Sequence, residues 1–399
     1  MMGFSSPWSA FFQDRLEAVR QANRYRAFRV FDTFQPGYIC QHGKTLLNLS
    51  ANDYLGLAGD EEGREEARLL AEILPYGGSA SRLVTGNLAI HHELEKLLAE
   101  WKGTQAALLF ASGYQTNVGL LSALASKGDA IFSDKWNHAS IIDGCLLSGA
   151  HFNRYRHNDL EDLESLLRSK RPRKRIIVTD GVFSMDGDLA LLPELNTLAQ
   201  KYNALLIVDE AHATGILGPH GAGSWAHYQL PVAEHVILMG TLSKAVGVQG
   251  GYVCASQDII EYLINYCRSQ IYSTALSPLL AGLIHFNINR IISEPNHIEA
   301  CHHAARVLKS ALQKYEIQGT DTLTPILPIH IGESQTALVV ADALFEQGTV
   351  AVAIRPPTVP EGKARLRLSV CAAHRDEDLK QAAQQIATIF KSHGHLPGK

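Results

Sequence analysis

Short apolar runs that alternate with helical segments are the feature that most limits how this chain can fold. The runs have the length of β-strands and lie at residues 107–112, 130–134, 175–180, 205–210 and 236–241. Amphipathic segments with a period near 3.6 residues lie between several of them. Strands that are apolar on both faces are typical of a parallel sheet covered by helices on each side. The sequence therefore predicts an α/β fold with a mostly parallel sheet, to which residues 250–256 add a further strand.

The pattern changes after about Pro278. Long helical segments come first, followed by a strand, a helix, two strands and a last helix, which together describe a compact α+β unit. The length of 399 residues also exceeds what a single core usually supports. We therefore expect a large domain at residues 50–277 and a small C-terminal domain at 278–399, with the helix and strand of residues 1–49 packed against the small domain.

Charge and composition exclude several classes of protein. The net charge is −4, and the one basic cluster, at residues 168–175, is narrower than the footprint of a nucleic-acid motor. The chain contains no apolar run of about 18 residues and no secretory signal, so we expect a cytoplasmic protein without a membrane partner. The six cysteines are scattered and form no Cys-x-x-Cys motif, which argues against a zinc site and against disulfides.

The sequence DEAH at residues 209–212 matches the motif after which a helicase family is named, so we consider whether the chain hydrolyses ATP. ATP hydrolysis by such enzymes requires a phosphate-binding loop of the form G-x-x-x-x-G-K-[ST]. The sequence GKT occurs at residues 43–45, but Tyr38 stands where the first glycine must be. The segment that follows is strand-like where a helix should begin. The sequence therefore argues against a nucleotide motor and against a nucleic-acid partner.

A lysine and an aspartate at the ends of two predicted strands indicate a different chemistry. Lys244 follows the run at 236–241, and Asp209 is the last residue but one of the run at 205–210. Open α/β sheets bind ligands at the carboxyl ends of their strands. A lysine amine condenses with the aldehyde of pyridoxal phosphate, and a carboxylate pairs with the protonated pyridine nitrogen of that cofactor. Together, Lys244 and Asp209 predict a pyridoxal phosphate site.

The remaining parts of such a site follow the same order along the chain. Gly113 and Tyr114 stand at a strand-to-helix turn, where free backbone N–H groups can hold a phosphate. His212 and Ser184 are placed to reach the phenolic oxygen of the cofactor ring, and His138 to lie flat on the ring face.

Three motifs in this order resemble those of a known family. VFSMDGD, VDEAHATG and GTLSKAVG are similar to motifs of the α-oxoamine synthases, fold-type I pyridoxal phosphate enzymes that join an amino acid to an acyl thioester with loss of carbon dioxide. The similarity runs from SANDYLGLA near Asn52 to AIRPPTVPEGKARLRLS near the end of the chain. The resemblance implies a mostly parallel, seven-stranded sheet flanked by helices, with a smaller α+β C-terminal domain.

The resemblance also implies roles for individual residues. Catalysis is implied for Lys244, His138 and Asp209, and a phosphate contact for Thr241. Ser273 and Thr274 match phosphate contacts that come from the second subunit, which implies a homodimer with shared active sites. Arg367 matches the arginine that binds the amino acid carboxylate. Other substrate contacts are implied for Arg26 and Thr358 along the acyl chain, and for Asn52 and His138.

Within the family the resemblance is strongest to the member of biotin biosynthesis. That enzyme condenses L-alanine with a pimeloyl thioester, carried by coenzyme A or by acyl carrier protein. Ala213 departs from its pattern, which often has glycine there, and so leaves open a sister synthase that uses glycine or serine with another thioester. A plain aminotransferase and a non-catalytic binding protein on the same fold are further alternatives.

Overall fold

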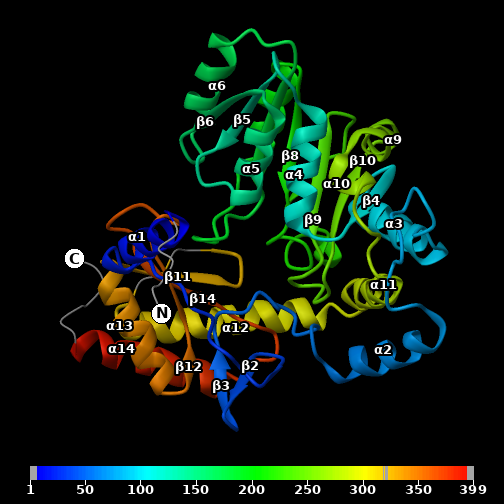
Figure 1. The fold of residues 1–399 in the computed structure, drawn as a ribbon. Coiled ribbons are helices and arrows are strands. Elements are labelled where there is room, and N and C mark those ends of the chain that lie inside the picture. Colours follow the sequence, from blue (N-terminus) through cyan, green and yellow to red (C-terminus); the bar gives the residue numbers. More distant parts are fainter. Residues whose placement is uncertain (1–6, 318, 320–321, 393–399) are drawn as a thin grey trace.

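The chain forms two lobes joined by long helices (Figure 1). The computed structural model describes residues 7–317, 319 and 322–392. The larger lobe is built around one broad sheet, and the smaller lobe contains the C-terminal strands and helices together with the strands near the N-terminus. Within the described residues, no helix is long and apolar enough to cross a bilayer.

The sheet of the large lobe has seven strands. They are β4 (Ala106–Phe110), β5 (Ala130–Asp134), β6 (His151–Tyr155), β7 (Arg175–Asp180), β8 (Ala204–Asp209), β9 (Val236–Thr241) and β10 (Gly251–Ala255). Their order is β4-β10-β9-β8-β7-β5-β6. Strand β10 runs antiparallel to both neighbours, and the other pairs are parallel. The predicted α/β fold with a mostly parallel sheet is confirmed.

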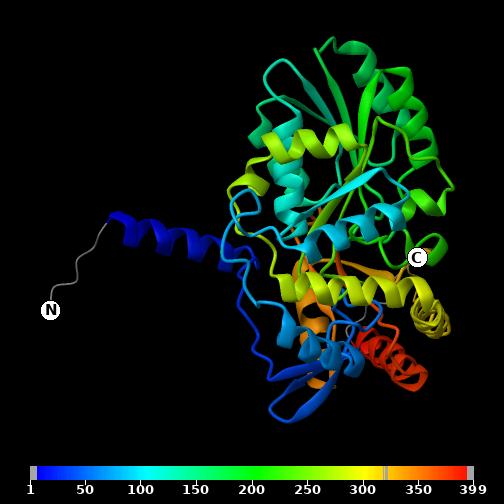
Figure 2. The same ribbon diagram turned by 90° about the vertical axis from the view of Figure 1, so that its right-hand side faces the viewer.

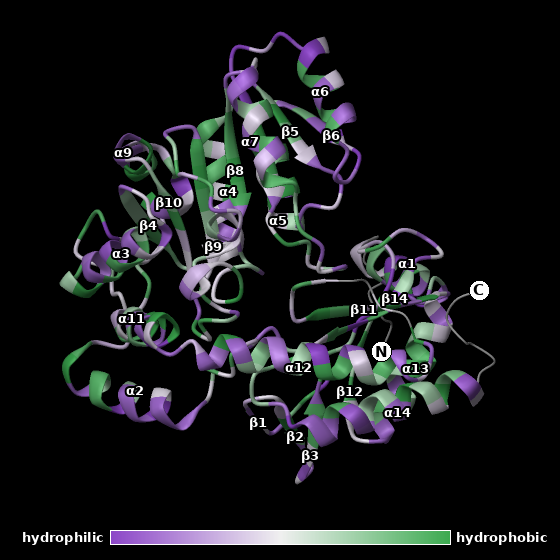
Figure 3. Ribbon diagram, turned by 180° about the vertical axis from the view of Figure 1, so that it is seen from behind, coloured by the Kyte–Doolittle hydropathy of each residue, from purple (hydrophilic) through white to green (hydrophobic). Residues whose placement is uncertain are grey.

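Both faces of this sheet are buried because successive strand residues enter different cores. Leu206 and Val208 of β8 belong to one cluster, and Ile207 between them belongs to another. The first cluster is covered by α3 (Ala89–Lys102), α6 (Leu160–Ser169) and α7 (Leu192–Lys201). The second is covered by α4 (Gly113–Leu124), α5 (Ala139–Ser148) and α9 (Gln257–Tyr266). The strands of the large sheet are accordingly rich in hydrophobic residues in Figure 3.

A separate hydrophobic cluster fills the small lobe. Its helices are α12 (Asn296–Gln313), α13 (Ser334–Glu346) and α14 (Asp376–Ser392), and its main sheet has the order β11 (Ile326–Gly332), β14 (Ala364–Ser369) and β13 (Val352–Ile354). A second sheet joins β1 (Thr33–Gln35), β2 (Tyr38–Gln41) and β3 (Lys44–Asn48) to β12 (Thr349–Val350). The N-terminal strands therefore share a sheet with the C-terminal part of the chain.

Helix α11 (Pro278–Ser293) connects the lobes, and α2 (Glu61–Ile73) lies against it. Ala281, Ile284 and Ile288 of α11 belong to the hydrophobic core of the large lobe. The chain therefore leaves the core of the large lobe after α11, and not at the predicted boundary between residues 277 and 278. The division into domains stays a prediction.

The first helix, α1 (Pro7–Gln21), extends away from both lobes, as Figure 2 shows. Its large apolar side chains are exposed, with Trp8 at 67% and Phe12 at 57%. The helix therefore presents an uncovered apolar face, whereas we expected the N-terminal helix to pack with the small domain.

Candidate active site

A cavity of about 260 Å³ opens at the carboxyl ends of β7, β8 and β9. The predicted residues that line it are Gly113, Tyr114, His138, Asp209, His212, Thr241 and Lys244. These positions lie up to 131 residues apart in the sequence, from 113 to 244, and meet because parallel strands end at the same edge of the sheet.

Asp209 is buried at the end of β8 and is held in place from two sides. Its Oδ2 accepts a 2.7 Å hydrogen bond from Nδ2 of Asn117, and its Oδ1 accepts a 2.9 Å bond from the N–H of Ala211. Asp180 stands opposite it in the register of β7 and β8. Burial first, and then the charge of Asp209, raise the pKa of Asp180 well above its usual range. One carboxylate beside one protonated carboxyl group is therefore the arrangement that this end of the cavity favours.

Lys244 lies in the turn after β9 and points at His212, with Nζ 2.9 Å from Nε2. Burial lowers the pKa of Lys244 to about 8, although the negative charge of Asp209 opposes this shift. A lysine with such a pKa has a substantial neutral fraction near neutral pH. Its amine can therefore act as a nucleophile or as a base.

His212 links the lysine to Tyr54, a tyrosine that no sequence motif predicts as a site residue. Its Nδ1 lies 2.6 Å from the hydroxyl of Tyr54, a completely buried side chain. Burial and the charges of Lys244 and Arg367 lower the pKa of His212 well below its ordinary value, so the ring is neutral. Since an ammonium at Lys244 donates to Nε2, the proton of the ring resides on Nδ1 and is donated to Tyr54.

The Tyr54 hydroxyl joins this chain to the predicted substrate residues. It donates to Oδ1 of Asn52 at 3.2 Å and accepts from Nη2 of Arg367 at 3.2 Å. Arg367 also donates through Nε to the carbonyl of Ser184 at 2.6 Å. Asn52, Ser184 and Arg367 therefore lie beside the lysine–histidine pair, although they do not line the cavity itself.

His138 begins α5 and lines the cavity at its side. Its Nδ1 lies 2.8 Å from Oγ of Ser140, and that hydroxyl accepts a 2.9 Å bond from Asn117. Burial lowers the pKa of His138, since its surroundings disfavour the charged ring. A neutral imidazole held by this network is suited to lie against a flat ring.

The part of the cavity lined by Gly113 and Thr241 has the features of an anion site. Helix α4 starts at Gly113, where the first backbone N–H groups have no acceptor within the helix. A Cβ added at Gly113 would lie 2.9 Å from Cβ of Thr241, so a side chain there would crowd the cavity wall. The hydroxyl of Thr241 lies 2.7 Å from Oγ of Ser243. Backbone amides and hydroxyl groups thus converge where the sequence predicts a phosphate.

The turn after Asp209 rests on a buried ion pair. Lys102 and Glu210 both have side chains with 0% exposure. The Lys102 ammonium donates to Glu210 Oε2 at 2.8 Å, Thr214 Oγ1 at 2.9 Å and the Ala222 carbonyl at 2.7 Å. Three acceptors satisfy the ammonium fully, which is what a charge in a dry core requires. Nothing near Lys102 in the sequence marks its partner, so the sequence alone does not predict this pair.

Four predicted residues lie away from the cavity. Arg26, Thr358 and Thr274 are exposed and Ser273 is half-buried, and none of them lines it. Thr274 forms a bridge with Ser81. Nη1 of Arg355 donates to the carbonyl of Asn23 at 2.7 Å, so the segment of Arg26 lies near the segment that carries Thr358. The structure of one chain does not bring these residues to the lysine, and their roles stay predictions.

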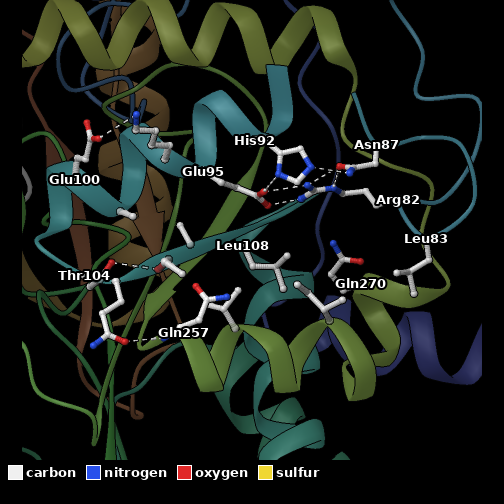
Figure 4. A pocket seen from close by; sticks show the side chains of 17 residues that line it. Arg82, Leu83, Asn87, His92, Glu95, Glu100, Thr104, Leu108, Gln257 and Gln270 are labelled. Atoms are coloured by element: carbon white, nitrogen blue, oxygen red, sulfur yellow. Dashed lines mark hydrogen bonds and ion pairs between the residues drawn. The ribbon is translucent and has the colours of Figure 1, made fainter. Parts of the chain in front are cut away.

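A second cavity, of about 560 Å³, lies between α3 and α9 along β4, the edge strand of the large sheet (Figure 4). Its polar side chains mostly bond to one another. Arg82 pairs with Glu95 and Asn87, and Asn87 bonds to His92. Oε1 of Glu95 also accepts a bond from the N–H of Leu109 on the edge strand. The lysine, aspartate and histidines with predicted catalytic or cofactor roles therefore line the first cavity and not this second one.

Fold and site together define an enzyme of fold type I, the class that uses pyridoxal phosphate. The chain belongs to the aminotransferase class I and II family, whose model matches residues 44–386. Its resemblance to the α-oxoamine synthases is confirmed by full-length relatives and by solved structures.

One relative, from Bacillus mycoides (strain KBAB4), is provisionally named 8-amino-7-oxononanoate synthase. It is 44% identical over 98% of this chain and 99% of its own length. A serine palmitoyltransferase variant from S. paucimobilis, solved with a bound PLP–myriocin aldimine, has a TM-score of 0.90 and 28% identity over 98% of this chain and 99% of its own. The 8-amino-7-oxononanoate synthase from Francisella tularensis has a TM-score of 0.76 and 28% identity, with 88% and 99% covered.

Proposed function

We propose that this chain is a pyridoxal phosphate-dependent acyltransferase that condenses L-alanine with a pimeloyl thioester and releases carbon dioxide, giving 8-amino-7-oxononanoate for biotin biosynthesis. The observation that carries the proposal is that the amine of Lys244 and the carboxylate of Asp209 line one cavity. The full-length relative from Bacillus mycoides supports the choice of substrates.

The residues of the cavity fit the cofactor. Lys244 would hold the aldehyde carbon, Asp209 the ring nitrogen, and the start of α4 with Thr241 the phosphate. Gly113 leaves free the space that a Cβ would fill next to Thr241. Oδ1 of Asp180, on the cavity wall, is buried without a hydrogen-bond partner among the described residues, so this wall retains an unused polar group.

When bound, the cofactor withdraws electrons from the α-carbon of the amino acid. The chain's own residues must then move one proton and fix the substrate. Lys244, with a pKa of about 8, is suited to remove the α-proton and to return it. His138 covers one side of the cavity and limits how the amino acid can turn.

Arg367 is suited to bind the amino acid carboxylate. It uses Nε and Nη2 for its bonds to Ser184 and Tyr54, and a guanidinium carries five N–H donors in a planar fork. A carboxylate fixed in this way directs the α-hydrogen towards Lys244. In the condensation the α-carbon bonds to the thioester carbonyl carbon, the thiol leaves, and the carboxylate carbon departs as carbon dioxide.

The proposed enzyme is a homodimer, and the predicted residues that lie away from the cavity support this part of the proposal. Ser273 and Thr274 do not line the cavity of their own chain, so in this proposal they contact the phosphate in the second subunit. Arg26 and Thr358 line the path of the acyl chain, where an arginine can pair with the distal carboxylate of a pimeloyl group. The acyl carrier is coenzyme A or acyl carrier protein.

The test is to measure thiol and carbon dioxide release for alanine, glycine and serine, each with pimeloyl and shorter thioesters. We expect the highest kcat/KM for alanine with the pimeloyl thioester. A clear preference for serine with a long acyl thioester would support a sister synthase, which the similarity of the fold to serine palmitoyltransferase favours. Amino-group transfer to a keto acid without any thioester would instead identify an aminotransferase.

A further inference from the structure

A histidine outside the cavity stands between two carboxylates. Nδ1 of His157 lies 3.1 Å from Oδ1 of Asp134, and Nε2 lies 2.8 Å from Oδ2 of Asp188. Ionised carboxylates accept hydrogen bonds and cannot donate them, so both ring nitrogens must carry protons. The geometry therefore favours an imidazolium at His157.

Asp134, the first carboxylate, holds the segment that presents His138. It ends β5 and is completely buried. Its Oδ1 accepts a 2.8 Å bond from the N–H of Trp136, and its Oδ2 accepts a 2.9 Å bond from the N–H of Asn158. The Asp134 carboxylate therefore fixes the backbone of the segment from Asp134 to His138, and His157 partly neutralises the charge of that carboxylate.

Asp188, the second carboxylate, belongs to the loop that carries Ser184. The ends of this loop are joined by the bridge between Val182 and Leu189, and the N–H of Phe183 donates to the Asp188 carbonyl at 2.9 Å. The same loop meets strand β14 of the small lobe twice, through Asp186 with Arg365 and through the Ser184 carbonyl with Arg367. The position of Asp188 is therefore tied to that of Arg367.

Two aromatic rings enclose the His157 ring. Trp136 stacks on it, with the ring centroids 3.9 Å apart and an angle of 15° between the planes. Phe183 meets it edge-on at 4.4 Å. Trp136 comes from the His138 segment and Phe183 from the Ser184 loop, so the imidazolium contacts both segments through its faces as well as its nitrogens. A cation on the face of a tryptophan is itself stabilised.

We propose that His157 is a positioning residue, an imidazolium that fixes the segment of His138 relative to the Ser184 loop, the loop that contacts Arg367 of β14. This assignment rests on the proposed function for the roles of His138 and Arg367. It goes beyond that function because His157 lies outside the cavity and touches neither the lysine nor any group expected to bind the substrate.

Charge explains why loss of the ring proton would loosen this contact. The groups that face His157 from the packed elements are the carboxylates of Asp134 and Asp188 and the uncharged rings of Trp136 and Phe183. Burial opposes protonation, but the bonds to the two aspartates outweigh it and raise the pKa of His157 to about 9. Because the folded pKa is raised, the stabilisation is complete below the ordinary histidine pKa and is lost as pH rises through about 9.

The first experiment follows the fluorescence of Trp136 in the full chain without added substrate. The difference in emission between the wild type and a Trp136→Phe variant is recorded from pH 6 to 10.5. We expect a single transition near pH 9, because a protonated ring stacked on an indole quenches its emission. An Asp188→Asn variant should shift the transition to lower pH. If emission from Trp136 does not change across this range, or if Asp188→Asn leaves the transition in place, the proposal is wrong.

The second experiment measures the kinetic effect of His157→Gln, with His235→Gln as the matched control. His235 bonds to Asn196 and directly precedes the amino end of β9, whereas the cavity lies at the carboxyl ends of the strands and His235 does not line it. We expect the KM for the amino acid to rise about tenfold, with a smaller fall in kcat, because the Ser184 loop moves and no longer holds the Arg367 guanidinium in place, while Lys244 stays. An unchanged KM in a folded His157→Gln variant contradicts the proposal. If the wild type shows no condensation at all, the proposed function fails, and the fluorescence transition still decides the state of His157.

Discussion

The two halves of the site differ in how much of their structure one chain supplies. On the cofactor side, Asp209, His212 and Thr241 are buried and bonded to neighbours from several elements. On the predicted acyl side, Arg26 and Thr358 lie exposed on the surface. The side that binds a single rigid cofactor can be formed completely by the fold of one chain. A half that meets a long, mobile acyl chain and a second subunit is completed only on assembly or binding.

The largest expected effect comes from the cofactor half. Lys244→Ala should reduce thiol release at least about a thousandfold, since both the covalent anchor and the base are removed. The circular dichroism spectrum should stay that of the wild type, because the lysine is not part of the core. Cofactor retention, read from visible absorbance, should fall together with activity. Substantial turnover in this variant would show that Lys244 is neither the cofactor anchor nor the base.

A smaller effect is expected from crowding the phosphate end. Gly113→Ala places a Cβ 2.9 Å from Thr241, and we expect the Kd for the cofactor to rise about tenfold and the unfolding free energy to fall by about 1–3 kcal/mol. Gly77→Ala is the matched control, because an added Cβ there has no atom within 4 Å. Equal effects of the two substitutions on cofactor binding would contradict the claim that the cofactor site requires glycine at position 113.

The acyl half is probed by Arg26→Ala. We expect the KM for the pimeloyl thioester to rise about tenfold, equal to the loss of about 1.4 kcal/mol of binding, with no change in the KM for alanine or in the Kd for the cofactor. Arg64→Ala removes another exposed positive charge, on α2, and serves as the control. A matching rise in the KM for alanine would mean that the halves are not separate.

The smallest effect concerns stability and pH. Burial lowers the folded pKa of Lys244 from 10.5 to about 8, so between these values the unfolded chain binds more protons than the folded one. The unfolding free energy of the protein without cofactor should therefore rise with pH across this window, relative to a Lys244→Met variant. Urea denaturation of both proteins at several pH values measures the difference. A wild type that loses stability relative to the variant over this range would contradict the lowered pKa.

Much of the cofactor half could be predicted because its signals are local. Lys244 and Asp209 each follow an apolar run, and the strands that carry them, β9 and β8, are neighbours in the sheet. Strand β3 also begins at Lys44, where a nucleotide motor would need a helix.

The residues that the sequence did not reveal act through distant partners. Strand β6 was missed because the sequence HFNRY at the sheet edge has no apolar pattern. Tyr54 becomes a site residue only because His212 and Arg367 meet at its hydroxyl, which lies 158 and 313 positions away from them. His157 is likewise defined by carboxylates on two other segments. Contacts of this kind follow from the tertiary structure and leave no periodicity in the sequence.

The pairing of Lys102 with Glu210 restricts how such a protein can change over time. Either partner alone would leave a bare charge in a dry interior, at a cost of about 3–5 kcal/mol, which is a large part of the stability of an ordinary domain. Descendants of this gene can therefore discard the pair only by way of a double replacement. A designer who wishes to recast the neighbourhood of Asp209 should exchange both residues in a single step.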